Sequence, residues 1–217
     1  MFVRDYMTKH PVMIEPTMSI VEAQGIMAEV HVRHLPVIEE GKRLVGLITR
    51  ERLRIPAAKL ASLNVWEITR FLSNLTVKDV MVEADEVITI SPDITLEEAA
   101  RIMVENKVGC LPVLEDGVVA GIITEIDMLS HLMELMASHI PGVRATVRMP
   151  NQRGELAKLV NAISAQGWGI LACGGVPAPK MPDKWDAVVK IRGVSKDAVA
   201  DALGQVEGQE LLDVREK

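Results

Sequence analysis

The feature that most constrains this chain of 217 residues is an internal repeat. The stretch RHLPVIEEGKRLVGLITRERL begins at Arg33, and GCLPVLEDGVVAGIITEIDM, which begins at Gly109, repeats it with changes. When the two stretches are aligned, Pro36 falls on Pro112, and the likeness extends over a unit of about 60 residues. A unit of this size cannot bury its apolar face alone, so the repeat predicts two copies of one fold that cover each other.

Each copy contains the same predicted elements. A short strand, VMIEP or VITIS, precedes an amphipathic helix that opens with the spacing of a capping box, at Ser19 in one copy and Thr95 in the other. Two apolar strands follow, joined by a turn at Glu-Gly or Asp-Gly. A second helix is expected from Thr49 or Thr124. The order β-α-β-β-α, present twice, predicts an α/β (α+β) fold.

The segments after each copy differ in character. Residues 56–76 carry apolar side chains three or four positions apart, which predicts a linker helix. Pro141 and Gly142 mark a boundary after the second copy. The expected divisions of the chain are therefore 1–55, 56–76, 77–140 and 141–217.

The tail, residues 141–217, has a different pattern. VRATVRM alternates like a strand, and GELAKLVNAISAQG has apolar residues at helical spacing. WGILACGG and WDAVVKIRG follow, then a helix in KDAVADALGQV and a last strand in ELLDVR. The order β-α-β-β-α-β predicts an antiparallel split-βαβ sandwich with both helices on one face.

Composition narrows the class of protein. The net charge is −6 and the acidic excess lies in residues 1–140, which disfavours nucleic acid as a partner. No apolar run approaches the roughly 18 residues of a membrane span. The two cysteines stand far apart, and no histidine has metal-ligand spacing to a cysteine or carboxylate. We therefore expect a cytoplasmic protein without a metal site.

The two copies resemble the cystathionine-β-synthase (CBS) domain pair, or Bateman module, and the tail resembles a ferredoxin-like ACT domain. The whole order, including SLNVWEITRFLSNLTVKDVM, resembles the bacterial acetoin-utilisation regulatory protein family. This resemblance implies an adenine nucleotide (AMP, ADP or ATP) or S-adenosylmethionine as ligand of the CBS pair. It also implies an amino acid as ligand of the tail.

The sharpest motif is similar to the Gly-x-x-[Ser/Thr]-x-x-Asp segment of CBS domains and consists of Gly121, Thr124 and Asp127. Thr124, at a helix start, offers a hydroxyl beside free backbone N–H groups, which suits a phosphate. Asp127 offers a carboxylate that can accept from both hydroxyls of a ribose. Gly121 would let the ligand approach the strand closely.

The first copy changes this motif, because Arg52 stands where the second copy has Asp127. Arginine has five donors and no acceptor, so it cannot receive the ribose hydroxyls. Glu51 is one position away, about 100° around a helix, and is a poor replacement. We therefore expect one nucleoside clamp in two clefts, the other cleft being empty or binding phosphate alone.

The resemblance also implies further site residues. Thr8, Val12 and Met13 would line the adenine side of the Asp127 site, and Arg33 and His34 match positions where some CBS domains carry phosphate-binding basic residues. In ACT domains the loop before the first helix often brings backbone donors to an amino-acid carboxylate. That loop corresponds here to Asn151, Arg153, Gly154 and Glu155.

Plainer interpretations of the same residues stay open. Thr124 could be only a helix cap and Asp127 only a partner of the helix dipole. Arg33 and His34 could be solvated at a strand edge. Cys110, in an apolar strand, fits a small core residue better than a nucleophile.

Three classes of function follow. The first is a regulatory protein, without a catalytic cofactor, that senses a small-molecule effector and signals to a protein partner. Leu129, Leu132 and Leu135 predict a homodimer or higher homo-oligomer. The second is a structural dimer with degenerate sites. The third is an enzyme, against which stands the lack of any nucleophile–base or paired-carboxylate constellation.

Overall fold

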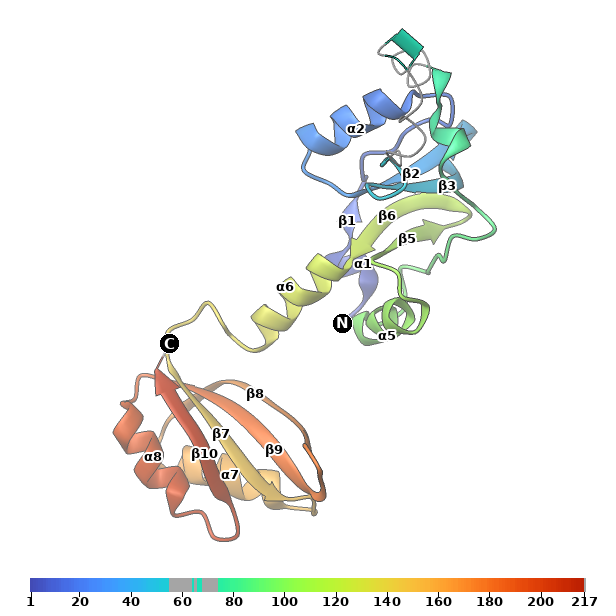
Figure 1. Ribbon diagram of the computed structural model, residues 1–217. Coiled ribbons are helices and arrows are strands. Elements are labelled where there is room, and N and C mark those ends of the chain that lie inside the picture. The colour runs from blue at the N-terminus through green and yellow to red at the C-terminus, as the bar shows by residue number, and fades with distance from the viewer. Residues whose placement is uncertain (55–63, 65, 68–73, 217) are drawn as a thin grey trace. The chain divides into compact units, whose positions relative to one another are not determined.

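The computed structural model describes residues 1–54, 64, 66–67 and 74–216 (Figure 1). The chain divides into two compact units, Met1–Met128 and Leu129–Lys217, which meet inside one helix. Most of the helix predicted over residues 56–76 lies outside the described residues. The boundary proposed at residue 141 stays a prediction.

The first unit contains both copies of the repeat. The first copy holds α2 (Ile20–Glu29), β2 (His34–Glu39), the 3-10 turn η1 (Glu40–Lys42) and β3 (Arg43–Thr49). The second holds α5 (Leu96–Asn106), β5 (Cys110–Glu115), β6 (Val118–Thr124) and the start of α6 (Glu125–Leu135). Short elements precede them: α1 (Val3–Tyr6), β1 (Thr8–Lys9), η2 (Val77–Asp79) and β4 (Val82–Glu83).

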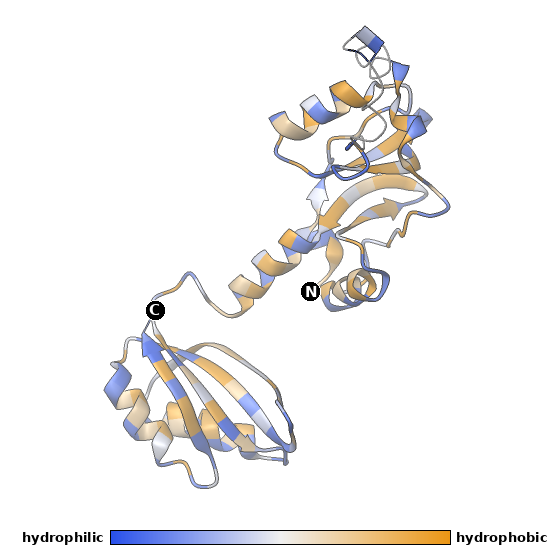
Figure 2. Ribbon diagram, in the orientation of Figure 1, coloured by the Kyte–Doolittle hydropathy of each residue, from blue (hydrophilic) through white to orange (hydrophobic). Residues whose placement is uncertain are grey.

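The two hairpins of the repeat have the same register. Val37 lies opposite Gly46 in the first, and Val113 lies opposite Gly121 in the second, with a bulge after each valine. Both turns use left-handed glycines, which removes the steric cost of a positive φ there. The apolar residues predicted for these strands colour β5 and β6 along most of their length (Figure 2). The duplication predicted from the sequence is therefore confirmed in the backbone.

The short strands before the repeats are exchanged between the copies. β1 pairs with β6 of the second copy, and β4 pairs with β3 of the first. In each pairing one strand crosses close to a glycine of the other, Gly121 or Gly46, and the missing side chain makes room for it. A Cβ on Gly121 would lie 2.5 Å from the sulfur of Met7, and one on Gly46 would lie 2.6 Å from the sulfur of Met81. Each sequence copy is thus completed by a segment that precedes the other copy.

Some predicted elements are shorter in the structure. The strands predicted at VMIEP and VITIS are single bridges, Ile14 to Val37 and Ile90 to Val113. Proline follows soon after each bridge and has no N–H with which to extend the ladder. The helix predicted from Thr49 is a turn as far as Leu53, and the residues that follow lie largely outside the described part.

The predicted helix caps are present, one of them in full. Ser19 and Glu22 form a reciprocal capping box at the start of α2. The Thr95 hydroxyl accepts from the Glu98 N–H, 3.2 Å away, while the Glu98 carboxylate lies 3.8 Å from Arg101. Both helices therefore begin where the sequence predicts.

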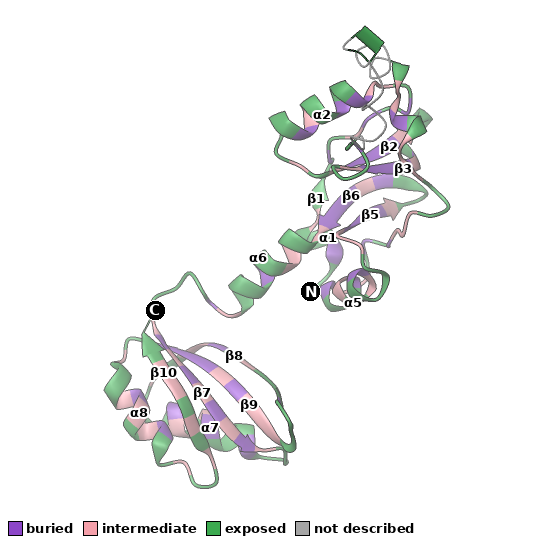
Figure 3. Cartoon of the chain, viewed as in Figure 1, coloured by how far each residue is buried: buried purple, intermediate pink, exposed green. Residues whose placement is uncertain are grey.

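The second unit follows the order expected for the tail. It contains β7 (Val143–Pro150), α7 (Glu155–Ala165), β8 (Gly169–Ala178), β9 (Met181–Arg192), α8 (Lys196–Gly204) and β10 (Glu210–Glu216). The antiparallel sheet has the order β10-β7-β9-β8, and α7 and α8 lie on one face (Figure 1). Along β7 every second residue is buried (Figure 3). Those residues join one apolar cluster with Leu159, Ile163, Val199 and Leu203 from the helices.

Two adjacent glycines of β8 offer a direct test of this packing. A Cβ on Gly175 would overlap the indole of Trp185, whereas one on Gly174 would make an ordinary contact at 3.7 Å. Gly175→Ala should therefore lower the free energy of unfolding of the second unit by about 1–3 kcal/mol. Gly174→Ala is the matched control and should change it far less. Urea unfolding that shows equal effects would contradict this account.

Candidate functional site

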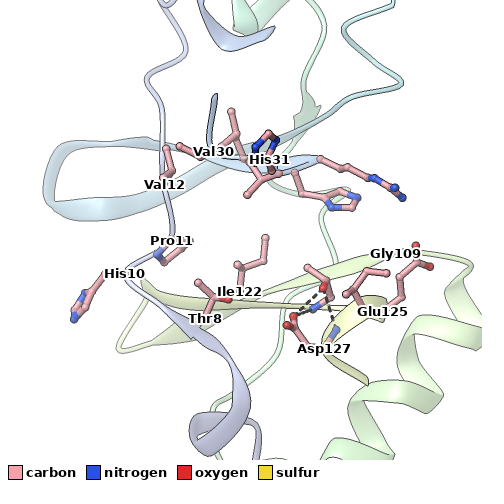
Figure 4. A pocket seen from close by; sticks show the side chains of 16 residues that line it. Thr8, His10, Pro11, Val12, Val30, His31, Gly109, Ile122, Glu125 and Asp127 are labelled. Atoms are coloured by element: carbon pink, nitrogen blue, oxygen red, sulfur yellow. Dashed lines mark hydrogen bonds between the residues drawn. The ribbon is translucent and has the colours of Figure 1, made fainter. Parts of the chain in front are cut away.

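The first unit contains a cavity of about 510 Å³ that both repeats and β1 line (Figure 4). One wall is formed by the end of β6 and the first turn of α6. The facing wall is formed by the segment before β2 and the start of that strand. Thr8 and Val12, on and after β1, close one side. The crossing at Gly121 places β1 in this position.

Asp127 is held at the cavity wall by a capping box. The Thr124 N–H and hydroxyl both donate to Oδ2 of Asp127, at 2.7 and 2.8 Å (Figure 4). The Asp127 N–H lies 3.4 Å from the Thr124 hydroxyl oxygen. Thr124 and Asp127 therefore do cap α6, as the plainer interpretation of the sequence has it. Both bonds from Thr124 reach the same oxygen, which leaves Oδ1 for a ligand.

The facing wall is basic. Arg33 and His34 line it together with His31, and His10 lies near Thr8 (Figure 4). Burial is the main reason that the pKa of His34 lies below its ordinary value. Glu51 and Glu125 oppose this shift, while Arg33 adds to it. An anion in the cavity would meet cationic or protonatable groups on this side and the acidic capping box on the other.

Six of the predicted residues line this one cavity: Thr8, Val12, Arg33, His34, Thr124 and Asp127. Met13 does not line it, because the extended chain turns Val12 and Met13 to opposite sides. Gly121 does not line it either, and the room left by its missing Cβ is taken by Met7 and the Thr8 carbonyl. The expected role of Gly121 in ligand approach is thus replaced by a role in strand crossing.

Among the titratable residues that line the cavity, sequence reasoning missed three, His10, His31 and Glu125. His10 and His31 have positive φ values of 51° and 55°, and no sequence pattern indicated these turns. Glu125 lies between Thr124 and Asp127, so its closeness to the motif was the available signal.

The equivalent positions of the first copy are arranged differently. The Arg52 N–H donates to the Thr49 hydroxyl at 3.3 Å, so only half of the box is kept. Glu51 supplies the carboxylate in this turn. Its pKa is lowered by its own backbone N–H, by the Thr49 hydroxyl, and by His34 and Arg54. Glu51 thus bonds within its own turn, and it is not among the lining residues.

Cys110 occupies the position that corresponds to His34. It is buried, and it packs in one apolar cluster with Leu47, Ile122 and Val87. Burial raises the pKa of its thiol to about 12, with a smaller contribution from Glu125. Cys110 is therefore a core residue, since the thiolate is the reactive form.

In the tail, the four predicted ligand residues do not act alike. Asn151, Arg153 and Gly154 are exposed, and Gly154 begins α7 with a φ of 91°. Glu155 is buried, and its carboxylate accepts from Lys158 at 2.6 Å and from Gln209 at 3.2 Å. These two bonds, that from Lys158 first, lower its pKa. Glu155 thus connects α7 to the segment before β10 through its side chain, while the expected part of its backbone in ligand binding stays a prediction.

Across residues 1–54, 64, 66–67 and 74–216, no group of three or more His, Cys, Asp or Glu is arranged to hold a metal ion. The helices in that part of the chain include none with the length and apolarity that a membrane crossing requires.

Comparison with known proteins matches both repeats to one family. Residues 3–55 and 77–134 match the CBS domain. An A-adding tRNA nucleotidyltransferase of Aquifex aeolicus is 30% identical over 132 residues, which are 61% of this chain and 14% of that protein. Inosine-5'-monophosphate dehydrogenase of Staphylococcus aureus is 29% identical over 55% of this chain and 22% of the enzyme. The chain thus spans under a quarter of these relatives.

Solved structures match over most of their own length. A protein of Vibrio cholerae assigned to acetoin utilization (AcuB) is 28% identical with a TM-score of 0.53, covering 64% of this chain and 95% of that one. CBSX2 in complex with AMP is 27% identical with a TM-score of 0.50, covering 61% and 96%. CBSX2 is a CBS-pair protein of Arabidopsis thaliana.

Proposed function

Because this chain belongs to the CBS domain family, we propose that it is a non-catalytic regulatory protein that binds an adenine nucleotide in the cavity of its first unit. The observation that carries the proposal is the Asp127 carboxylate, held by Thr124 at a cavity wall that faces Arg33 and His34. The ribose hydroxyls donate to Asp127. The phosphate lies toward the basic wall.

The geometry supports this orientation through preorganisation. The capping box fixes the carboxylate before the ligand arrives, so little side-chain freedom is lost on binding. The first turn of α6 carries N–H groups and the positive end of the helix dipole, which favour a nearby anion. Val12 and Ile122 provide apolar surface for a base.

The charge of the facing wall favours a phosphorylated adenosine over a cationic ligand. Arg33 supplies a cationic side chain, His10 and His31 supply imidazole N–H donors, and a bound anion favours the imidazolium form of His34. S-adenosylmethionine carries a sulfonium cation in the same place and is the weaker candidate. The AMP complex of CBSX2 supports AMP as a ligand of this class. ADP and ATP are longer candidates of the same class.

We place a single nucleotide on each chain. In the first copy, Arg52 lacks an acceptor and Glu51 is bonded within its own turn. Cys110 stands where the first copy has His34, and it packs in an apolar cluster with Val87. The second copy thus has an apolar residue at a position that is basic in the first. The same changes favour the rival function, a structural dimer whose sites have both degenerated, and direct binding measurements separate the two.

The tail is proposed to be an ACT domain that binds an amino acid. Its β-α-β-β-α-β order and its sheet order support this fold. The ligand site is the exposed loop of Asn151, Arg153 and Gly154 with the backbone of Glu155, whose side chain is bonded to Lys158. We propose the domain boundaries 1–55, 56–76, 77–140 and 141–217, a cytoplasmic location and a regulated protein partner.

The central prediction uses the difference between the two copies. Hydrogen bonds to charged groups contribute about 1.5–3 kcal/mol each, so Asp127→Ala should weaken AMP binding at least ~10-fold. Arg52→Ala, at the equivalent position, should leave it nearly unchanged. Titration calorimetry should give one tight site per chain. Two equal sites, or parental affinity in Asp127→Ala, would show that the clamp is assigned wrongly; no binding to the parent would favour the structural dimer.

A second prediction concerns protons. Burial lowers the pKa of His34 in the free protein, so this imidazole is mostly neutral at pH 7. A bound phosphate raises the pKa of His34, as Glu51 and Glu125 do, while Arg33 lowers it. AMP binding should therefore take up protons, and it should strengthen as pH falls toward 6. Calorimetry at pH 7 in two buffers of different ionisation enthalpy measures this uptake. His34→Gln should remove it, and equal uptake in both proteins would contradict the proposal.

A third prediction concerns assembly. Leu129, Leu132 and Leu135 on α6 are each at least half exposed, and Ile126 and Met133 add to the apolar surface. Such a surface marks an association site, so we expect a homodimer or a larger homo-oligomer. Light scattering should give at least twice 23.8 kDa at micromolar concentration. Leu132→Glu should shift the mass toward the monomer, and a monomeric parent would contradict this expectation.

A further inference from the structure

Lys190 is buried on a sheet face where its neighbours along β9 and on β7 are at least partly exposed, while Ala172, its partner on β8, is buried with it. On β9, Val189 and Ile191 belong to the apolar cluster of the second unit. Side chains alternate along a strand, so Lys190 projects to the opposite face, away from that cluster. Arg144, its partner on β7, keeps about a third of its side chain exposed there. Lys190 is only 2% exposed. Something other than α7 and α8 must cover it.

The cover is the turn that follows α6. The Lys190 ammonium donates to the Ala137 carbonyl at 2.8 Å. Ala137 is itself buried, and its neighbour Met136 has its sulfur 3.7 Å from the Cβ position of Gly174 on β8. All four residues belong to the second unit. The end of α6 is therefore seated on the open face of this sheet.

The turn is a helix C-terminal motif with an unusual residue. The Ser138 N–H donates to the Met133 carbonyl, and the Ala137 N–H donates to the Glu134 carbonyl. This is a Schellman arrangement, in which glycine is usual at the left-handed position. Ala137 holds that position, with a φ of 49°. The Lys190 bond supports the strained residue, and the negative end of the α6 dipole favours the ammonium.

The contact is well suited to open and close. A buried cation is usually stabilised by a carboxylate, because a neutral acceptor offsets only part of its desolvation. In the part of the chain that the structure describes, the Ala137 carbonyl is the hydrogen-bond partner of Lys190. The salt bridges of this face, such as Arg148 with Asp186, do not include Lys190. The favourable hydrogen bond to the Ala137 carbonyl is therefore opposed by the free-energy cost of removing the Lys190 ammonium from water.

The other end of α6 lies in the nucleotide cavity. Its first turn contains the capping box of Thr124 and Asp127, and the turn that follows its last residue, Leu135, contains Ala137. We infer that Lys190 is a latch that ties the end of α6 to the C-terminal sheet, so that occupancy of the cavity and the state of this sheet are coupled. The coupling rests on the proposed nucleotide function; the latch itself does not.

Hydrogen exchange on the full chain, read by mass spectrometry, tests both parts. Without nucleotide, Lys190→Met should raise exchange of the amides of residues 136–138 at least ~10-fold, since these amides depend on the latched turn. With AMP, the parent should change exchange in residues 133–138, and Lys190→Met should lose that change. Lys190→Gln is a second variant of the same kind.

Lys184→Met is the matched control, because Lys184 lies on the same strand and the same face but is only half-buried. It should retain both behaviours of the parent. Unchanged exchange in residues 136–138 of both Lys190 variants would overturn the latch. AMP that binds the parent without changing residues 133–138, or that changes them equally in Lys190→Met, would overturn the coupling. AMP that does not bind at all would overturn the proposed function, while the nucleotide-free comparison still decides the latch.

Discussion

The close crossing of β1 over β6 is the constraint on which the first unit depends. It requires a residue without a side chain at Gly121, because Met7 and the Thr8 carbonyl occupy that space. The same crossing occurs between β4 and β3 at Gly46. Each hairpin therefore receives its neighbouring strand from the segment before the other copy. Thr8 reaches the cavity only because β1 pairs with the second copy, so the site is a product of this exchange.

The capping box of α6 joins stability and function in one pair of side chains. Thr124 and Asp127 satisfy the first backbone donors of the helix, and the same bonds fix the carboxylate toward the cavity. A functional and a structural interpretation of this motif therefore do not compete. In the first copy the Arg52 N–H donates to the Thr49 hydroxyl but its side chain has no acceptor, and the described residues there form a turn. Loss of one acceptor removes the full cap and the ligand group together.

The sequence predicted the parts that follow local rules. The hairpins, the helix starts at Ser19 and Thr95 and the order of the tail come from periodicity, turn residues and caps, which act over a few positions. Six residues that the family resemblance pointed to also line the cavity. What the sequence did not predict depends on tertiary placement: the exchange of the short strands, the absence of Met13 from the cavity lining and the side-chain bonds of Glu155. The left-handed turns at His10 and His31 were missed for the same reason.

Lys190, a buried charged residue, carries the proposed link between the cavity and the tail. A lysine on an open sheet face normally extends its ammonium into water, because an ion transferred to a protein interior loses its hydration. Lys190 instead contacts the end of the helix that begins at Thr124. An apolar side chain in its place would stabilise the turn only through buried apolar surface. That interaction is non-directional, so it would not favour one orientation of the backbone carbonyls. A buried ammonium does, since only the Schellman turn directs the Ala137 carbonyl toward it. The proposed latch therefore favours the ordered end of α6, the helix whose first turn lines the cavity.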